Sequence, residues 1–193
     1  MPLDLLLLGP PGAGKGTQAK RISADRGIPQ IATGDMLREA MAAGSELGRQ
    51  VKPIYDRGDL VPDDLIVALI RERLGQDDTH AGFVLDGFPR TLPQAEALDE
   101  MLAAIGRELS VVLEFQIDEE EAVRRLLGRA GEEHRADDDP DVVRHRFAVY
   151  RERTAPLSRY YLARGILVGI PAGGTVPEVS AEVQSVLDQV EAR

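Results

Sequence analysis

A glycine-rich segment near the start of the chain has the residue types and spacing needed to hold a chain of phosphates. The segment Gly9-Pro10-Pro11-Gly12-Ala13-Gly14-Lys15-Gly16-Thr17 satisfies the pattern G-x-x-x-x-G-K-[ST], with an apolar run before it and a helical pattern after it. Glycines let successive backbone N–H groups turn inward around a phosphate, and the following helix adds the positive end of its dipole. Lys15 is then expected to reach the β- and γ-phosphates, with the Thr17 hydroxyl near Mg²⁺. The segment predicts a nucleoside triphosphate site without specifying the reaction.

A second candidate is the apolar run Phe83-Val84-Leu85-Asp86, which ends in a carboxylate. In P-loop proteins a carboxylate at the end of a neighbouring strand supports the hydrated Mg²⁺. By itself the pattern is weak, because an aspartate at the end of a strand is often only a turn residue. The next four residues, Gly87-Phe88-Pro89-Arg90, place an arginine beside the same carboxylate and near the predicted phosphates.

The composition restricts the possible partners. The chain has 193 residues and a net charge of −10, which argues against a broad nucleic-acid-binding surface. Its basic residues are 20 Arg and 3 Lys; a codon preference explains these totals but not the clustering of arginines, which indicates a local anion site. With no cysteine, neither disulfides nor thiolate metal sites can form. The run Leu3–Leu8 contains Asp4 and follows no basic residue, so it is interpreted as a buried strand and not a signal peptide. We expect a cytoplasmic protein that does not bind membranes.

Apolar, β-branched runs alternate with helical patterns along the chain, which favours right-handed βαβ crossovers and a parallel sheet covered on both faces. The expected strands are Leu3–Leu8, Gln30–Ala32, Phe83–Asp86, Val111–Ile117 and Ile166–Ile170. The expected helices are Lys15–Arg26, Leu65–Leu74, Pro93–Ile105, Glu119–Leu127, Pro140–Ala163 and a last one from Pro177. Ligands of such sheets bind beyond the carboxyl ends of the strands, where the two motifs above lie.

Two segments fit the core poorly. Residues 33–74 are helical, with turn signals at several glycines, and suggest a small inserted lobe. Residues from Gly128 to Pro140 have almost no apolar content and suggest an exposed loop, of the kind that often serves as a lid. We therefore predict one domain over residues 1–193, with a core of residues 1–32, 75–127 and 140–193, an inserted lobe of 33–74 and a lid of 128–139.

Six segments, in their order along the chain, resemble the motifs of the adenylate kinase family, and the resemblance spans essentially the whole chain. They are Gly9–Thr17, Thr33–Arg38, Asp59–Pro62, Asp86–Arg90 with Gln94, Arg135–Asp138 and Thr154–Leu157. The fourth and fifth are specific to nucleoside monophosphate kinases. The resemblance implies the P-loop kinase fold, an α/β fold with a five-stranded parallel sheet, in its short-lid form. It also implies reversible transfer of the terminal phosphoryl group of Mg-ATP to AMP, giving two ADP, in adenine nucleotide homeostasis.

The resemblance also implies roles for individual residues. It assigns ATP to Gly12, Ala13, Gly14, Lys15, Gly16, Thr17, Arg125, Arg129 and Gly174. It assigns AMP to Thr33, Arg38, Asp59, Leu60, Val61, Gly87, Phe88, Pro89, Arg90, Gln94, Arg135 and Arg146. The charges that would act on the transferring group are Lys15, Arg90, Arg125, Arg129, Arg135 and Arg146. A side-chain amide can pair with adenine through one donor and one acceptor, the role implied for Gln94.

No residue is expected to bind a metal directly: Thr17 and Asp86 would lie near hydrated Mg²⁺, and a lid without cysteine would hold no structural zinc. A monomer is expected. The resemblance leaves a UMP/CMP kinase of the same fold as an alternative, although Thr33, Gln94 and the lack of any Asn favour AMP. The lack of Asn argues strongly against a GTP-binding switch, because the guanine-binding motif of such proteins, Asn-Lys-x-Asp, requires Asn. A nucleotide-binding protein with weak catalysis stays open.

Overall fold

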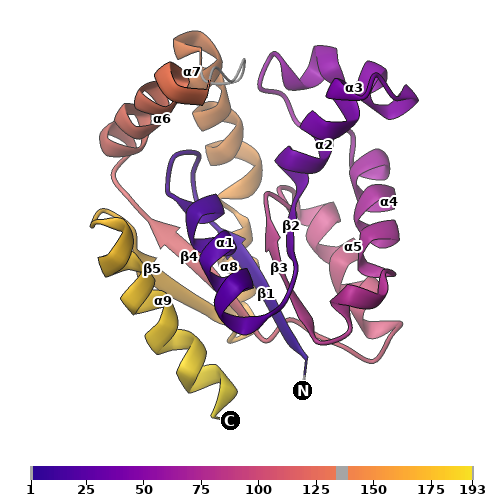
Figure 1. Ribbon diagram of the computed structural model, residues 1–193, viewed down its shortest axis with the longest axis vertical. Coiled ribbons are helices and arrows are strands. Elements are labelled where there is room, and N and C mark those ends of the chain that lie inside the picture. Colours follow the sequence, from indigo (N-terminus) through magenta and orange to yellow (C-terminus); the bar gives the residue numbers. More distant parts are fainter. Residues whose placement is uncertain (1, 134–138, 193) are drawn as a thin grey trace.

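Five parallel strands form the centre of the protein in a computed structural model, which describes residues 2–133 and 139–192 and, for 129–133, only the backbone. The strands are β1 (Leu3–Leu8), β2 (Gln30–Ala32), β3 (Gly82–Asp86), β4 (Val111–Gln116) and β5 (Leu167–Pro171). They lie side by side in the order β2-β3-β1-β4-β5, and every pairing is parallel (Figure 1). The predicted five-stranded parallel sheet is confirmed.

Strand β1 shows why the sheet is covered on both faces. Side chains alternate between the two faces of a strand, so a run of leucines supplies both cores. Leu5 and Leu7 pack in one buried cluster and Leu6 and Leu8 in the other, and all four are at most 2% exposed. Burying one such side chain stabilises the fold by about 1.5–3 kcal/mol. The central strand is therefore fixed by the hydrophobic effect on both sides.

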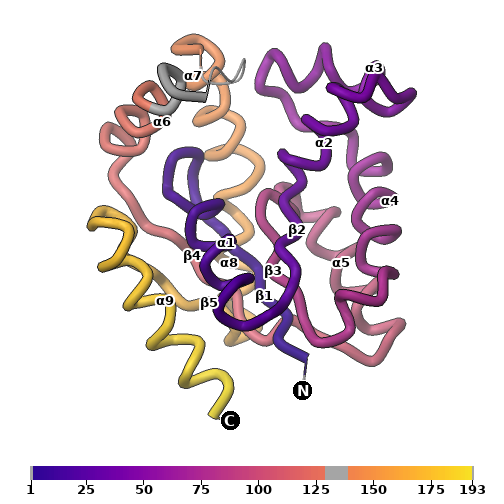
Figure 2. Tube along the Cα trace, viewed as in Figure 1, coloured from indigo at the N-terminus to yellow at the C-terminus, as the bar shows by residue number. Residues whose placement is uncertain are grey.

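Helices cover each face of the sheet (Figure 2). On one face α1 (Lys15–Arg26) and α9 (Val176–Glu191) share the cluster that contains Leu5. On the other face α4 (Asp63–Leu74), α5 (Leu92–Ala103) and α8 (Leu157–Ala163) share the cluster that contains Leu6. None of the described helices is long and apolar enough to cross a membrane.

Two helical segments stand at the same end of the sheet, on either side of the loop between β1 and α1 (Figure 1). One consists of α2 (Thr33–Ala42) and α3 (Glu46–Tyr55), and the other of α6 (Glu119–Glu133) and α7 (Pro140–Val149). The expectation of a loop from Gly128 is wrong for its first part, because α6 continues to Glu133. Residues 129–133 include Arg, Ala and two Glu, which are good helix formers, so the glycines at 128 and 131 do not end the helix. Residues 134–138 of the predicted lid lie outside the described part of the chain.

The single helix expected over Pro140–Ala163 is also wrong, because a wider turn interrupts it. Residues Tyr150–Thr154 form a π-helical turn between α7 and α8, and Ala155 N donates to Tyr150 O, five residues back, at 2.8 Å. Pro156, which follows, has no N–H to continue the regular helical ladder. The turn lets the Thr154 hydroxyl donate to Arg90 O at 2.9 Å.

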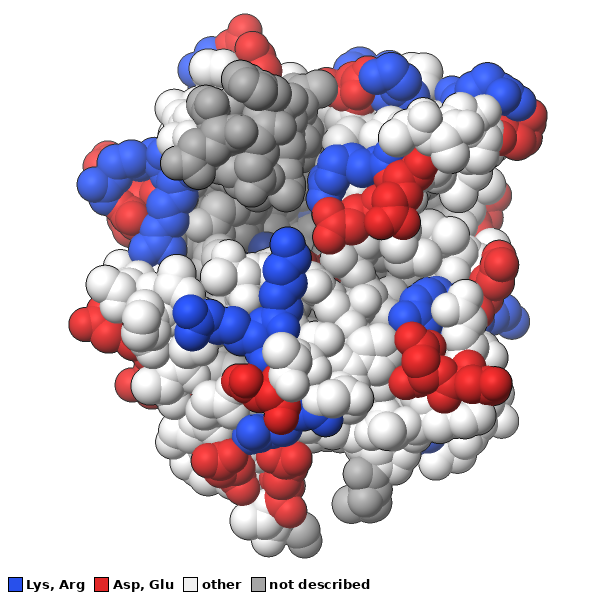
Figure 3. Space-filling model, in the orientation of Figure 1, with Lys and Arg blue, Asp and Glu red and all other residues white. Residues whose placement is uncertain are grey.

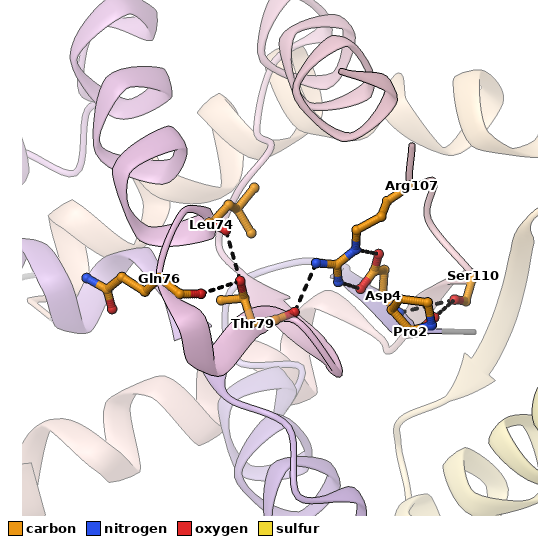
Figure 4. A network of polar contacts seen from close by, with 7 residues as sticks. All are labelled: Pro2, Asp4, Leu74, Gln76, Thr79, Arg107 and Ser110. Atoms are coloured by element: carbon orange, nitrogen blue, oxygen red, sulfur yellow. Dashed lines mark hydrogen bonds and ion pairs between the residues drawn. The ribbon is translucent and has the colours of Figure 1, made fainter. Parts of the chain in front are cut away.

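A buried ion pair closes the other end of the sheet (Figure 4). Asp4 of β1 is 1% exposed and accepts from Arg107 Nε at 2.8 Å, while Arg107 Nη1 donates to Thr79 O at 2.9 Å. Thr79 belongs to a short 3₁₀ helix, Asp77–Thr79, and its hydroxyl donates to Leu74 O at 2.8 Å. Burial raises the pKa of the Asp4 carboxyl, and the bonds from Arg107 oppose that shift. The pair joins β1 to the segments before β3 and β4, far from the glycine-rich loop.

Candidate functional site

The glycine-rich loop joins the carboxyl end of β1 to α1. Gly9, Gly12 and Gly14 have φ values of 141°, 80° and 84°, a region that favours glycine. A Cβ at Gly9 would lie 2.7 Å from Phe115 O, and one at Gly12 would lie 2.4 Å from Ala122 O. The loop therefore needs glycine both for its turn and for its close approach to β4 and α6.

Lys15 and Asp86 meet at this loop. Lys15 Nζ donates to Gly9 O at 2.8 Å and to Pro10 O at 2.9 Å, so the ammonium lies over the loop's own carbonyls. A Cβ built on Gly16 would be 3.4 Å from Asp86 Oδ2, which places the carboxylate against the start of α1. Burial raises the pKa of Asp86, although the charges of Lys15 and Arg90 act in the opposite direction. A further cation would be favourable beside this carboxylate.

Thr17 and Asp86 fit the outer coordination of Mg²⁺. Both side chains lie on the wall of one cavity, one as a hydroxyl and the other as a carboxylate. Mg²⁺ keeps several waters and is commonly bound through one or two protein oxygens together with substrate phosphates. Among the described residues there is no group of three or more His, Cys, Asp or Glu side chains that could hold a metal by itself.

Cations from four segments of the chain line this cavity, which has a volume of about 540 Å³. They are Lys15, Lys20 and Arg21 from the glycine-rich loop and the helix α1 that follows it, Arg38 from α2, Arg90 from the loop after β3 and Arg146 from α7. In Figure 3 a recess in the upper half of the molecule has Lys and Arg side chains at its edge. The volume is in the range of small-molecule sites. Positive charge gathered from distant segments makes the cavity suited to several phosphate groups.

Arg38 is held in place by two side chains. It donates to the Asp35 carboxylate and to the Tyr55 hydroxyl, and its guanidinium carbon lies 5.9 Å from the centre of the Tyr55 ring. Tyr55 ends α3 and lines the cavity, so it joins α3 to the arginine on α2. The sequence analysis missed Tyr55. An aromatic residue at the end of a helix carries no signal for such a contact before the tertiary arrangement is known.

Arg90 is fixed by the backbone around it. Its Nε donates to Gly87 O at 2.8 Å, and the peptide between Phe88 and Pro89 is cis. Gly87 has a φ of 85°, and a Cβ there would lie 2.6 Å from the Thr33 hydroxyl. Thr33 is buried and its hydroxyl donates to Asp86 O at 3.4 Å, so it supports the cavity wall from behind. The motif thus aims one guanidinium at the cavity.

The residues assigned to AMP, apart from Arg135, which lies outside the described part of the chain, divide into two groups. Those that line the cavity are Arg38, Asp59, Leu60, Gly87, Pro89, Arg90 and Arg146. Those that do not line it are Thr33, Val61, Phe88 and Gln94, all of them buried. Gln94 is 2% exposed, its Oε1 accepts from Arg90 N at 2.7 Å and its Nε2 donates to Asp63 Oδ1 at 2.6 Å. The structure therefore brings Gln94 beside Arg90 but not to the cavity surface, and it adds Asp63, which the sequence analysis missed.

A second pocket of about 360 Å³ adjoins the same loop. Its lining includes Gly12, Gly14, Thr17, Arg125 and Gly174. The Arg125 guanidinium donates to the backbone oxygens of Ala172, Gly173 and Gly174 at 3.0, 3.1 and 3.2 Å. Gly174 thus lies where the glycine-rich loop, α6 and the start of α9 meet. All six residues of Gly12–Thr17 line the first cavity, and four of them also line the second.

Of the predicted arginines near the lid, the structure places some and not others. Arg146 lines the cavity, and the Cβ that Gly58 lacks would lie 2.8 Å from Arg146 Cγ. The side chain of Arg129 and the whole of Arg135 lie outside the described residues. Further cavity residues without an assigned role are Lys20, Arg21, Asp35, Val149, Tyr150 and Thr154.

The fold and the site define a class of protein. A Lys-bearing glycine-rich loop between the first strand and the first helix, with an aspartate ending the adjacent strand, is the arrangement of a P-loop nucleotide-binding protein. The additional arginines in the same cavity are typical of a phosphotransferase, because they can hold a second phosphorylated molecule.

Comparison with known proteins gives the family. The family model described as "Adenylate kinase" matches residues 7–166. The adenylate kinase of Thermobifida fusca is 51% identical over 96% of this chain and 98% of its own length. The one from Caulobacter vibrioides is 50% identical over 98% and 100%, and the one from Thermus thermophilus is 51% identical over 95% and 96%. The chain belongs to the adenylate kinase family of phosphotransferases.

Proposed function

We propose that this protein reversibly transfers the terminal phosphoryl group of Mg-ATP to AMP and forms two ADP. One observation supports this most strongly: cations from four segments, among them Lys15, Arg38, Arg90 and Arg146, line a single cavity together with the glycine-rich loop and Asp86. An enzyme that binds only a triphosphate has no need of Arg38 and Arg90 beyond the loop. Two arginines placed there can hold the phosphate of a second nucleotide.

The residues act by positioning and charge. The loop N–H groups and Lys15 hold the β- and γ-phosphates of the donor, while Arg38 and Arg90 hold the phosphate of AMP. Mg²⁺, when bound with ATP, neutralises phosphate oxygens, and Thr17 and Asp86 would hold its waters. An AMP phosphate oxygen is already ionised and can attack directly, so no general base is needed. Catalysis then depends on aligning the two phosphates and stabilising the charge on the moving group.

Arg146 is proposed to contact the transferring group together with Arg135, and Arg125 and Arg129 to bind ATP. The support is that Arg146 lines the cavity and that Arg125 lines the adjoining pocket with Gly174. For Arg129 and Arg135 the support is the family motif alone. Gly174 is proposed to contact the adenine of ATP through its backbone, and Gln94 and Thr33 to select the adenine of AMP.

We propose that residues 33–74 and 128–139 move relative to a core of residues 1–32, 75–127 and 140–193. The first of these segments supplies Arg38, Tyr55 and Asp59 to the cavity wall, so closure over the cavity would exclude water, which could otherwise accept the phosphoryl group. The family also leads us to propose a monomer in the cytoplasm that needs no structural zinc and no nucleic-acid or membrane partner. Size-exclusion chromatography with light scattering tests the monomer.

The function is tested with purified protein and Mg-ATP, to which AMP, UMP, CMP and GMP are added in turn while ADP is measured. Rapid ADP formation with AMP and much slower formation with the other monophosphates is expected. Faster turnover of UMP or CMP would replace the proposal with a pyrimidine monophosphate kinase. Binding of ATP with no turnover of any monophosphate would leave a nucleotide-binding protein.

A further inference from the structure

We propose that Asp63 determines the specificity for the acceptor base by fixing the orientation of the Gln94 side-chain amide. In that orientation the amide can pair with adenine but not with the 6-oxopurine of IMP or GMP. The inference rests on the proposed function, because it needs AMP to bind with its base at Gln94. It adds a residue, Asp63, that does not itself have to touch the substrate.

The Gln94 amide has a fixed partner at each end. Its Oε1 accepts from the backbone N–H of Arg90 at 2.7 Å, and its Nε2 donates to Asp63 Oδ1 at 2.6 Å. The Thr91 hydroxyl donates to the same Asp63 oxygen at 3.1 Å and also caps α5 by accepting from Gln94 N at 3.3 Å. Gln94 is 2% exposed, so water does not compete for these bonds. The network joins the start of α4, which carries Asp63, to the start of α5.

The two partners permit only one amide orientation. A rotation by 180° would set Nε2 against the N–H of Arg90, which are two donors, and Oε1 against the Asp63 carboxylate, which are two acceptors. Buried polar groups left without a partner are costly, so the rotated form is strongly disfavoured. Asp63 is the first residue of α4, where the positive end of the helix dipole favours its negative charge. The carboxylate is the partner that forces Nε2 to its side.

The fixed orientation matches adenine. After the bonds to Arg90 and Asp63, the amide keeps one N–H on Nε2 and one lone pair on Oε1 for a ligand. Adenine offers an amino donor at N6 beside an acceptor at N1, which is the complementary pair. A 6-oxopurine offers an acceptor at O6 beside a donor at N1 and would need the rotated amide. A glutamine free to rotate could accept either base, whereas a glutamine held by Asp63 can accept only adenine.

The position of Gln94 adds one condition. Arg90, whose N–H binds Gln94, lines the cavity, while Gln94 itself lies behind the wall. The base of AMP therefore has to pass that wall while the bond between Asp63 and Gln94 is kept. When it does, the amide is already oriented and needs no rearrangement.

The experiment compares kcat/KM for AMP and for IMP, with Mg-ATP as donor, in wild type and in Asp63→Asn. Asparagine can accept or donate, so it no longer opposes the rotated amide, which then only the N–H of Arg90 disfavours, and the AMP:IMP ratio should fall about 10-fold or more. Asp63→Glu, which keeps a carboxylate, should retain most of the ratio. Asp64→Asn is the matched control, since this neighbouring carboxylate is exposed, and its ratio should stay within about twofold of wild type. Gln94→Leu should lose activity on AMP and gain none on IMP.

An unchanged AMP:IMP ratio in a folded Asp63→Asn protein would overturn the inference while leaving the proposed function intact. Absence of AMP turnover in the wild type would instead overturn the proposed function. If Asp63→Asn fails to unfold cooperatively, Asp63→Ser takes its place, since serine keeps a short polar side chain at the start of α4 without the carboxylate. A ratio lowered equally in Asp64→Asn would also count against the inference, because the effect would then be one of general charge.

Discussion

His145 on α7 lies with its Nε2 2.6 Å from Asp59 Oδ1, so the helix that carries Arg146 is joined to the loop that follows α3. The same loop also packs closely on α7, because the Cβ that Gly58 lacks would lie 2.9 Å from Val142 Cγ1. Asp59 receives a second bond, from Arg57 Nε at 3.0 Å. The contact thus joins α7, which we assign to the core, to the inserted lobe of residues 33–74, which we propose to move.

This contact predicts a dependence on pH. The hydrogen bond from His145, followed by that from Arg57, lowers the pKa of Asp59 from its ordinary value. A carboxyl whose pKa is lowered on folding stabilises the native state above its ordinary pKa of about 3.9 and loses that contribution as the pH falls through the lowered value. Both side chains are more than one third exposed, so His145→Ala should lower the free energy of unfolding by at most about 1 kcal/mol.

Hydrogen exchange of α7 should then be faster in His145→Ala than in wild type at pH 6, with His80→Ala as the control. Below the lowered pKa of Asp59 the two proteins should exchange alike. If the exchange rates of His145→Ala and wild type differ by the same factor at pH 6 and below the pKa of Asp59, then His145 stabilises α7 without Asp59.

Lys15→Met should abolish phosphoryl transfer and leave the fold cooperative. The ammonium is a point charge over the loop, bonded to Gly9 O and Pro10 O, and it is not part of the hydrophobic core. Activity should fall by at least about 10²-fold, the scale of losing one preorganised charge at a reaction centre. Lys52→Met, which removes an exposed ion pair with Asp56, is the control. Near-wild-type turnover of a folded Lys15→Met protein would remove Lys15 from the mechanism.

Arg146 and Arg38 should differ in the kinetic parameter that they affect. Arg146→Ala should lower kcat by about 10²–10³-fold with a smaller change in KM for AMP, because we place it at the charge that develops during transfer. Arg38→Ala should mainly raise the KM for AMP. Arg146→Lys should recover only part of the loss, since an ammonium cannot form the two-pronged contact of a guanidinium.

Arg144→Ala is the control for these variants. Arg144 lies on the same helix, its side chain is 73% exposed and it pairs with Asp141 at the surface. In steady-state kinetics, kcat and the KM for AMP of Arg144→Ala should be close to those of wild type. If Arg144→Ala and Arg146→Ala behave alike, the helix carries a general surface charge and the assigned role of Arg146 is wrong.

Arg107→Ala should destabilise the protein without a specific effect on catalysis. It leaves Asp4, which is 1% exposed, without its cationic partner, and breaking one side of a buried pair costs about 3–5 kcal/mol. Burial already raises the pKa of Asp4, and loss of Arg107 removes the bonds that oppose this rise. A carboxyl whose pKa is raised on folding destabilises the native state less as the pH falls, because the buried group becomes protonated and loses its charge. The deficit in unfolding free energy, measured by urea denaturation, should therefore shrink from pH 7 towards pH 5.

The control for Arg107 is Arg49→Ala, which removes an exposed pair with Glu46. Its effect should be within about 0.5 kcal/mol. A deficit for Arg107→Ala that is the same at pH 7 and pH 5 would show that packing on the Phe83 ring, 5.2 Å away, matters more than the charge of Asp4.

The sequence predicts most of the fold because its strongest signals are local. The limits of β1, β2 and α1 are the predicted ones, since a leucine run, a short apolar run and the glycine-rich loop each define an element within a few residues. The interruption of the helix after Val149 was missed although Pro156 signals it, because the apolar pattern continues through the break. The extension of α6 past Gly128 was not predicted, because two glycines and a low apolar content are typical of a loop, whereas Ala and Glu favour a helix.

For the site, the sequence predicts the charged residues that line the cavity, but not the residues that hydrogen-bond to the predicted site residues. Lys15, Arg38, Arg90 and Arg146 carry recognisable motifs and line one cavity. Tyr55 and Asp63 were missed because their contacts join separate helices: Tyr55 lies 17 residues from Arg38, and Asp63 lies 31 residues from Gln94. The resemblance implies that the Gln94 amide pairs with adenine, yet both polar atoms of this amide already form hydrogen bonds within the protein.

The central claim is that one cavity aligns the donor and acceptor phosphates for direct transfer. It is tested most directly by incubating the protein with ATP labelled in the γ-phosphate and AMP labelled in the base, and by following both labels at early times. The account predicts that the phosphate label appears in ADP that carries the AMP base, one label per base, with very little free phosphate, and that Lys15→Met forms neither product. Phosphate label released mainly to water, or absent from the ADP that carries the AMP base, would contradict it.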